Sequence, residues 1–326
     1  MAVLDGRDAG ALQAAAQRLA QGGLVAFPTE TVYGLGARAD DDAAVARIFE
    51  AKGRPSDHPL IVHVADVGQA RRYASRFDGA ALRLAQAFWP GPVTVIVPRA
   101  AGMGVAAAGG QDSIGLRCPA HPVAQALLLQ CVALGVSGVA GPSANRFGRV
   151  SPTTAAHVAG EFGVDLMVLD GGACSVGIES TIVDCSRDRP VLLRPGVLTR
   201  GQLERVLGQP LAERDAQSPR ASGTLEAHYA PTARLRLADA SALTALAAFP
   251  DRGRGMAVYS RTCPALPPEA RWARMPADPI EAARALFATL RAIDTPDVTQ
   301  IWVEQPPDAP EWEGVRDRLR RAAAAG

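Results

Sequence analysis

The sequence predicts an α/β protein of two domains, the first with a mixed sheet and the second with a small parallel sheet. Three observations support this prediction. Apolar runs of strand length alternate with segments of helical periodicity along most of the chain. The 326 residues, 48% of them hydrophobic, suffice for two buried cores. A polar stretch bounded by prolines, residues 209–232, separates the two regions and is interpreted as a linker.

Residues 1–208 form the first predicted domain. A helix is expected over 9–19, because apolar residues recur at helical spacing and two glycines follow, where a left-handed C-cap is expected. A helix over 43–51 takes Asp41 or Asp42 as its N-cap and ends before Gly53. The other expected helices are 78–88, 122–134 and 153–161, and the strands are 24–27, 60–64, 93–97, 113–117, 136–140, 166–169, 181–184 and 191–194. Consecutive strands late in this series allow antiparallel pairs, so the sheet is expected to be mixed.

Residues 233–326 form the second predicted domain. The expected strands are 235–237, 256–259 and 300–303, and the expected helices are 240–249, 279–293 and 312–324. Strands that alternate with helices in this way are typical of a three-layer domain with a parallel sheet.

Composition excludes several classes of protein. A net charge of +1 gives no global attraction to nucleic acid or to an anionic membrane. No window reaches about 18 apolar residues and the N-terminus has no apolar signal segment, so we expect a cytoplasmic protein without membrane contact. The cysteines are scattered and never spaced as CxxC, which favours reduced, buried thiols over a zinc site. They are Cys118, Cys131, Cys174, Cys185 and Cys263.

Lys52 is the only lysine among 34 basic residues, and Asn145 is the only asparagine. This bias indicates a compositional drift along the whole chain, in which positions that tolerate arginine would tend to have lost lysine. Lys52 and Arg54 lie at a predicted helix C-terminus, where the helix dipole favours any cation. An arginine would serve there equally well, whereas a compact ammonium that binds a phosphate as a point charge distinguishes the two residue types.

Polar residues flanked by glycine or proline gather at the ends of predicted strands. Taken singly, each has a structural alternative: Thr29 and Thr31 suit a tight loop, His63 suits a buried core position, and Arg117 suits a surface ion pair. Together they predict a ligand pocket lined by hydroxyls and cations. The remaining members of this set are Ser113, Ser143, Asn145, Ser151, Ser180, Thr181 and Arg194.

Several catalytic motifs are absent from the sequence. There is no GxGxxG at a strand-to-helix junction, no GxxxxGK[ST], no nucleophile elbow, no HExxH and no dense acidic cluster. A pocket rich in cations and hydroxyls but poor in nucleophiles suits chemistry at a phosphate for which the substrate supplies the nucleophile.

Seven ordered stretches, FPTETVYGLGA, KGRPSDHPLIVHV, WPGPVTVIV, GPSAN, GIESTIVD, LLRPG and HYAP, resemble the threonylcarbamoyl-adenylate synthases in their long form. The resemblance implies a YrdC-type twisted mixed-sheet domain over residues 1–208, followed by a smaller Rossmann-like three-layer α/β domain. It also implies the condensation of L-threonine, bicarbonate or CO2 and ATP, with Mg2+, to threonylcarbamoyl-AMP and pyrophosphate. The product would pass to the machinery that modifies the adenine next to the anticodon of tRNA, with at most a weak tRNA contact by this chain.

The resemblance also implies roles for individual residues, with Lys52 and Arg54 in catalysis. The residues expected around threonine are Thr31, His63, Arg117, Gly141 (through its backbone) and Ser180. Those expected around ATP are Lys52, Arg54, His58, Ser113, Ser143, Asn145, Ser151, Arg194, His228 and Tyr229. His58 stands where many relatives carry asparagine. Archaeal-type relatives place a Lys-Tyr pair ahead of HYAP as part of a lid that covers ATP. Leu225 and Glu226 stand at these positions here, so the contact of the lid with ATP is expected to pass to His228 or Tyr229 or to be absent.

Two alternative functions stay open at this stage. An RNA-binding or translation-associated module could use a concave basic face of the same fold, although the near-neutral charge and 5% aromatic content disfavour it. A carbamoyl-transfer domain of hydrogenase maturation would bring zinc-finger and acylphosphatase-like regions, which this sequence lacks.

Overall fold

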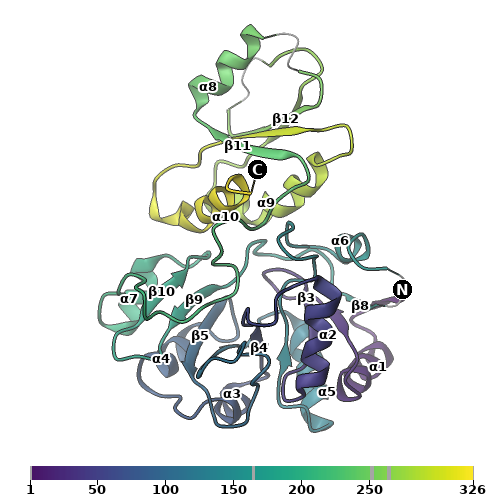
Figure 1. The fold of residues 1–326 in the computed structure, drawn as a ribbon, viewed down its shortest axis with the longest axis vertical. Coiled ribbons are helices and arrows are strands. Elements are labelled where there is room, and N and C mark those ends of the chain that lie inside the picture. The colour runs from purple at the N-terminus through teal and green to yellow at the C-terminus, as the bar shows by residue number, and fades with distance from the viewer. Residues whose placement is uncertain (1, 164–165, 250–252, 263–265, 326) are drawn as a thin grey trace. The chain divides into compact units, whose positions relative to one another are not determined.

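The computed structural model describes residues 2–163, 166–249, 253–262 and 266–325 (Figure 1). The chain forms two compact units, each of the predicted α/β class. The first comprises residues 1–147, 151–175 and 179–224, and the second comprises 148–150, 176–178 and 225–326. The stretch 209–232 is therefore divided: residues 209–224 pack with the first unit and 225–232 with the second.

Within the described residues, ten strands form one mixed sheet in the first unit, in the order β1-β8-β2-β3-β7-β4-β6-β5-β9-β10. The pairs β4/β6 and β5/β9 are parallel, whereas β5/β6, β4/β7 and β9/β10 are antiparallel. The bounds are β1 Ala2–Asp5, β2 Val25–Phe27, β3 Gly34–Arg38, β4 Ile61–His63, β5 Val93–Pro98, β6 Ser113–Arg117, β7 Val139–Ala140, β8 Met167–Asp170, β9 Thr181–Asp184 and β10 Val191–Arg194. This arrangement confirms the predicted mixed sheet.

Helices pack on both faces of this sheet. Successive side chains of β2 point to opposite faces and enter two different hydrophobic cores. Ala26 packs with α2 and α4, while Val25 and Phe27 pack with α1 and α5. The helices of this unit are α1 Ala9–Ala20, α2 Asp42–Lys52, α3 Val67–Tyr73, α4 Gly79–Phe88, α5 Pro122–Ala133, α6 Ala155–Ala159 and α7 Arg200–Leu207.

Four elements of the first unit were missed by the sequence prediction: β1, β3, α3 and α7. The stretch that contains β3 includes two glycines, Gly34 and Gly36, and no strand is expected there from the sequence. It becomes a strand because β2 and β7 pair with it on either side. A Cβ on Gly36 would lie 2.8 Å from the Val139 side chain, so glycine is required by packing and not by a turn.

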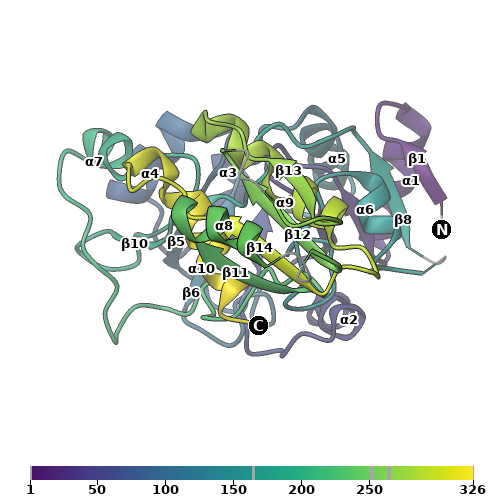
Figure 2. The same ribbon diagram turned by 90° about the horizontal axis from the view of Figure 1, so that it is seen from above.

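In the second unit, the described strands form a parallel sheet in the order β11-β14-β12-β13, which Figure 2 shows from above. The strands are β11 Arg234–Ala238, β12 Met256–Ser260, β13 Arg271–Arg274 and β14 Gln300–Glu304. Helix α8 (Ala240–Ala245) covers one face, and α9 (Pro279–Ile293) and α10 (Glu313–Ala323) cover the other (Figure 1). The short 3-10 turns η1 (Leu246–Ala248) and η3 (Pro310–Trp312) follow α8 and precede α10.

The predicted three-layer architecture of this unit is confirmed, but the predicted set of three strands was wrong. The missed strand, β13, is an edge strand with the sequence RWAR, and three of its four residues are exposed. A strand that buries almost nothing has no hydrophobic alternation for a sequence pattern to detect.

Two sequence expectations can be compared directly with the structure. No helix among the described residues is long and apolar enough to cross a membrane. The four described cysteines are buried and unbridged, as expected, and burial raises the pKa of the Cys131 and Cys174 thiols to about 12. Cys263 lies outside the described residues.

Helix α2, which carries Lys52 as its last residue, begins at an N-cap that the sequence indicated. The Asp41 carboxylate accepts hydrogen bonds from the backbone N–H groups of Ala43 and Ala44 at 3.0 and 3.1 Å. The helix ends at Gly53, whose φ of 64° is the left-handed C-cap conformation.

We expect Asp41→Ala to lower the free energy of unfolding by about 1 kcal/mol, because two helix N–H groups lose their acceptor. Asp78, the N-cap of α4, makes no side-chain capping bond and provides the matched control. Asp78→Ala should change the free energy of unfolding by less than about 0.5 kcal/mol. Urea denaturation of both variants measures the difference, and equal losses would contradict the capping role.

Candidate active site

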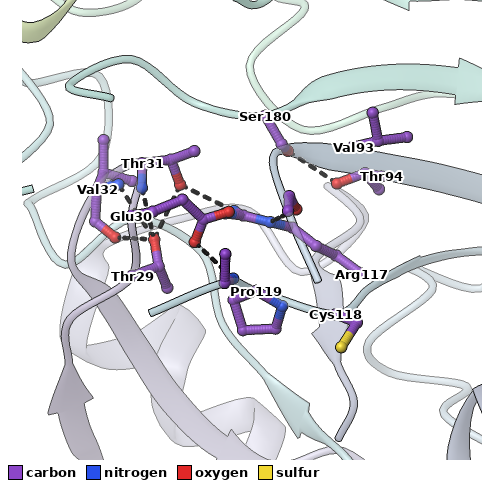
Figure 3. Close-up of polar contacts among 12 residues, drawn as sticks. Thr29, Glu30, Thr31, Val32, Val93, Thr94, Arg117, Cys118, Pro119 and Ser180 are labelled. Carbon is purple, nitrogen blue, oxygen red and sulfur yellow. Dashed lines mark hydrogen bonds and ion pairs between the residues drawn. The ribbon is translucent and has the colours of Figure 1, made fainter. Parts of the chain in front are cut away.

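Arg117 ends β6 and is surrounded by buried polar partners (Figure 3). Its Nη2 donates to Glu30 Oε1 at 2.6 Å, its Nη1 to Thr31 Oγ1 at 2.9 Å and its Nε to the Gly91 carbonyl at 3.2 Å. The other Glu30 oxygen accepts from the backbone N–H of Ala120 at 3.0 Å. A guanidinium has five N–H donors. Two of them thus have no acceptor among the described residues, and such a pair suits a carboxylate ligand.

His63 lies beside Arg117, because the parallel pairing of β4 with β6 places these two residues opposite each other. The His63 ring is buried, packs edge-on to Phe27 at 5.6 Å, and its Nδ1 has no hydrogen-bond partner among the described residues. Burial, with a further contribution from the Arg117 charge, lowers the pKa of His63 to about 3. The ring is therefore neutral at physiological pH.

Gly141 packs directly against this ring. Its N–H donates to the Ile61 carbonyl at 2.9 Å, and a Cβ built on it would lie 3.0 Å from His63 Nδ1. A side chain at residue 141 would press on the ring. The structure thus brings Thr31, His63, Arg117 and Gly141 into one cluster.

Ser180 lies between Thr94 of β5 and Arg194 of β10 and contacts both side chains. The Ser180 hydroxyl lies 2.8 Å from Thr94 Oγ1, and Arg194 Nη2 donates to the same hydroxyl at 3.2 Å. Arg194 also donates to the Ser180 carbonyl from Nε and Nη2, and to the Ser222 carbonyl from Nη1 at 2.9 Å. Ser180 and Arg194 are therefore in contact, although the sequence interpretation placed them at different substrates.

Lys52 is tied to the GPSAN loop. Its Nζ donates to the Ser143 carbonyl at 2.6 Å and to the Asn145 carbonyl, and its own carbonyl accepts from the N–H of Phe147 at 2.9 Å. Burial, followed by the charge of Arg54, holds the Lys52 pKa well below its usual range. The structure thus joins Lys52, Ser143 and Asn145 from two separate stretches of sequence.

Arg54 and His58 share one aromatic neighbour, Phe147. The Arg54 guanidinium lies 5.6 Å above the Phe147 ring and donates to the Pro59 carbonyl at 3.0 Å. The His58 ring lies 5.5 Å from the same ring. Burial and the Arg54 charge lower the pKa of His58, so this histidine is disposed to be neutral beside the cation.

Ser113 and Ser151 occupy separate positions. Ser113 lines a small pocket together with Ile61, Ile96, Ile182 and Ser222. The lining also includes Gly115, which has no side chain. The Ser151 hydroxyl instead donates to Glu179 Oε1 at 2.5 Å, and both residues are buried. His228 and Tyr229 belong to the second unit, where they pack against its helices.

Three residues of the clusters were missed in the sequence interpretation: Glu30, Thr94 and Glu179. Each has its polar side chain buried and bonded to a predicted site residue. Thr94 had a detectable signal, since it is the one polar residue in the apolar run VTVIV. Glu30 and Glu179 lie inside the stretches FPTETVYGLGA and GIESTIVD, but nothing in a linear pattern pairs them with Arg117 and Ser151.

The lowered pKa of His63 predicts a pH dependence of stability. Above pH 6.5, His63 is neutral in both the folded and the unfolded states, and its contribution to stability is complete. As the pH falls from 6.5 toward 3, only the unfolded state binds the proton, so the free energy of unfolding falls by up to about 1.4 kcal/mol per pH unit. We expect a shallower loss in His63→Gln than in the wild type over this window, measured by urea denaturation. Equal slopes would contradict the neutral, buried state of the ring.

The architecture and site geometry can be compared with known families. Residues 17–196 match the Sua5_yciO_yrdC family, described as "Telomere recombination", and residues 198–324 match the Sua5 family described as "Threonylcarbamoyl-AMP synthase, C-terminal domain". The chain is 37% identical to the threonylcarbamoyl-AMP synthase of Pyrococcus abyssi, over 96% of this chain and 94% of the relative. It is also 37% identical to the enzyme of that name from Bacillus subtilis, over 95% and 92% of the two chains.

Solved structures agree with these matches. The crystal structure of P. abyssi Sua5 complexed with L-threonine has a TM-score of 0.87 and 36% identity, over 96% of this chain and 94% of the other. A P. abyssi Sua5 variant in which a histidine and the following tyrosine are replaced by alanine gives the same TM-score at 35% identity. The chain therefore belongs to the threonylcarbamoyl-AMP synthases of the Sua5 type, a family of ATP-using nucleotidyltransferases with a YrdC domain and a Sua5 C-terminal domain.

Proposed function

We propose that this chain condenses L-threonine, bicarbonate or CO2 and ATP to threonylcarbamoyl-AMP and pyrophosphate, and that its product serves the modification of the adenosine next to the anticodon of tRNA. The observation that carries the proposal is the buried Arg117 guanidinium, which presents two N–H donors beside the Thr31 hydroxyl and the neutral His63 ring. The P. abyssi relative in complex with L-threonine supports it.

The amino acid is proposed to bind through its carboxylate to Arg117. Thr31 and Ser180 supply hydroxyls, and Gly141 supplies backbone contacts in a space that a side chain would fill. Glu30 balances the Arg117 charge before the substrate arrives, which keeps the guanidinium in one orientation. A neutral His63 offers hydrogen bonding without competing with Arg117 for the carboxylate.

The nucleotide is proposed to bind along the second group of residues. Lys52 and Arg54 face its phosphates and are the catalytic cations, while hydroxyl and amide side chains orient it. The full proposed set is Lys52, Arg54, His58, Ser113, Ser143, Asn145, Ser151, Arg194, His228 and Tyr229. No group of three or more His, Cys, Asp or Glu among the described residues could hold a metal ion. Magnesium is therefore proposed to arrive with ATP, bound to phosphate oxygens and neutralising part of their charge.

The chemistry requires no protein nucleophile. The deprotonated amine of threonine takes up CO2 to form a carbamate, and a carbamate oxygen attacks the α-phosphorus. The bond to the bridging oxygen of pyrophosphate breaks, and the electron pair leaves with pyrophosphate. Negative charge accumulates on phosphate oxygens, where Lys52, Arg54 and Arg194 would stabilise it.

The downstream partner is proposed to be the machinery that transfers the threonylcarbamoyl group to tRNA, with at most a weak tRNA contact by this chain. An RNA-binding module of the same fold is the alternative function. The net charge of +1 gives that alternative no global attraction to RNA and disfavours it, whereas RNA retention without ATP turnover would favour it.

Pyrophosphate release from ATP tests the proposed function. We expect release by the purified chain to require both L-threonine and bicarbonate, because the attacking oxygen belongs to their adduct. Omission of each substrate in turn provides the controls. Release that continues without threonine or without bicarbonate would contradict the assignment.

Lys52→Arg tests the catalytic cation. The Lys52 ammonium is buried between two carbonyls, so a bulkier guanidinium must shift the GPSAN loop. We expect turnover to fall at least about tenfold, equivalent to about 1.4 kcal/mol in the barrier. Arg47→Lys, an exchange of cations at an exposed position of the same helix, is the control and should retain turnover. Wild-type turnover in Lys52→Arg would exclude the phosphate role.

A further inference from the structure

Tyr229 has an unfavourable backbone conformation in a buried place. Its φ is 63°, in the left-handed region that residues with side chains rarely adopt, and its side chain is 1% exposed. A bulky residue keeps such a conformation only where surrounding contacts outweigh the strain. The contacts that hold Tyr229 come from the C-terminal helices α9 and α10.

Side chains of α9 and α10 pack on the Tyr229 ring, in addition to the neighbouring His228 ring. Phe287 of α9 stacks on it, with ring centroids 5.4 Å apart and planes 29° apart. The Arg318 guanidinium of α10 lies 5.4 Å from the ring centroid, in a cation–π arrangement. The Arg318 side chain is 0% exposed, so this cation is desolvated, which strengthens its attraction to the ring.

Helix α10 also binds the main chain on either side of this ring. The N–H of His228 donates to the Arg321 carbonyl at 3.2 Å, and Arg321 Nη1 donates to the Leu225 carbonyl. Residues 225–229 are thus held at three points by a single helix.

The cations of α10 are organised by one buried carboxylate, Asp317. It accepts from Arg318 Nη1 at 2.9 Å, from Arg321 Nε at 3.0 Å and from Arg320 Nη2 at 3.3 Å. Arg318 and Arg321 continue to the 225–229 segment. Arg320 is 74% exposed and makes no described contact with that segment. Asp317 therefore orients two cations that contact the segment and one that does not.

We propose that Asp317 and Arg318 are positioning residues for the His228-Tyr229 segment, so that the ATP contact proposed for this segment depends on helix α10. This inference rests on the proposed role of His228 and Tyr229 in ATP binding. Neither Asp317 nor Arg318 touches a substrate in this proposal; they act through Tyr229.

Arg318→Met in the full-length protein tests the inference, because methionine retains much of the volume but removes the cation. We expect the KM for ATP to rise at least about tenfold, while the KM for threonine and kcat at saturating ATP change less than about threefold. Arg320→Met is the matched control on the same carboxylate and should leave all three constants unchanged. An unchanged KM for ATP in Arg318→Met, or an equal rise in Arg320→Met, would overturn the proposal.

A double-mutant cycle separates positioning from general stability. In a chain that already carries His228→Ala and Tyr229→Ala, Arg318→Met should have no further effect on the KM for ATP. If Arg318→Met raises the KM for ATP by the same factor in this background as in the wild type, Arg318 acts independently of the segment and the proposal is overturned. If Arg318→Met does not fold, Arg318→Lys replaces it, since a lysine keeps the charge but changes its geometry over the ring.

Hydrogen exchange provides a readout that needs no activity. We expect amides of residues 225–230 to exchange at least about tenfold faster in Arg318→Met than in Arg320→Met, while strand β14 keeps its protection. Equal exchange in the two variants overturns the positioning role, even where the enzyme is active. Wild-type protein that releases no threonine-dependent pyrophosphate overturns the proposed function instead, and the exchange result still decides whether α10 positions the segment.

Discussion

The buried ion pair between Arg117 and Glu30 is the interaction on which the rest of the candidate threonine site depends. Both side chains are almost fully buried, and each carboxylate oxygen of Glu30 has its own donor, Arg117 on one side and the Ala120 N–H on the other. Such a pair is tolerated in a protein interior only when its geometry satisfies both partners. The pair joins the loop after β2 to the end of β6, and it leaves Arg117 with two donors for a ligand.

Lys52, the buried cation of the candidate nucleotide residues, is stabilised in a different way from Arg117. Lys52 is also buried, but its ammonium is met by the Ser143 and Asn145 carbonyls instead of by a carboxylate. Carbonyl oxygens stabilise a cation without cancelling its charge, which is compatible with the phosphate contact proposed for Lys52. Burial is the main cause that lowers the pKa of Lys52, and the charge of Arg54 adds to it. This environment gives a physical reason why the only lysine of the chain lies at this position.

The two units use buried charge in a comparable way. In the C-terminal unit, Asp317 gathers the arginines of α10, and one of them, Arg318, is desolvated over Tyr229. The strained backbone of Tyr229 is thereby retained in a segment whose own composition is polar and irregular. A residue of the predicted linker thus owes its conformation to helices α9 and α10, which follow it much later in the sequence.

The sequence by itself determined the α/β class, most helices and strands, and the residue types of the site, because periodicity and strand-end polar residues are local signals. Helix 279–293 and strands 113–117, 181–184 and 191–194 were predicted to the residue. Only the tertiary structure decided that β3 is a strand, that β13 exists at an edge, and that Glu30, Thr94 and Glu179 are partners of site residues. Strand pairing and buried ion pairs join residues far apart in the chain: Glu30 and Arg117 are 87 positions apart, and no local pattern encodes such a contact.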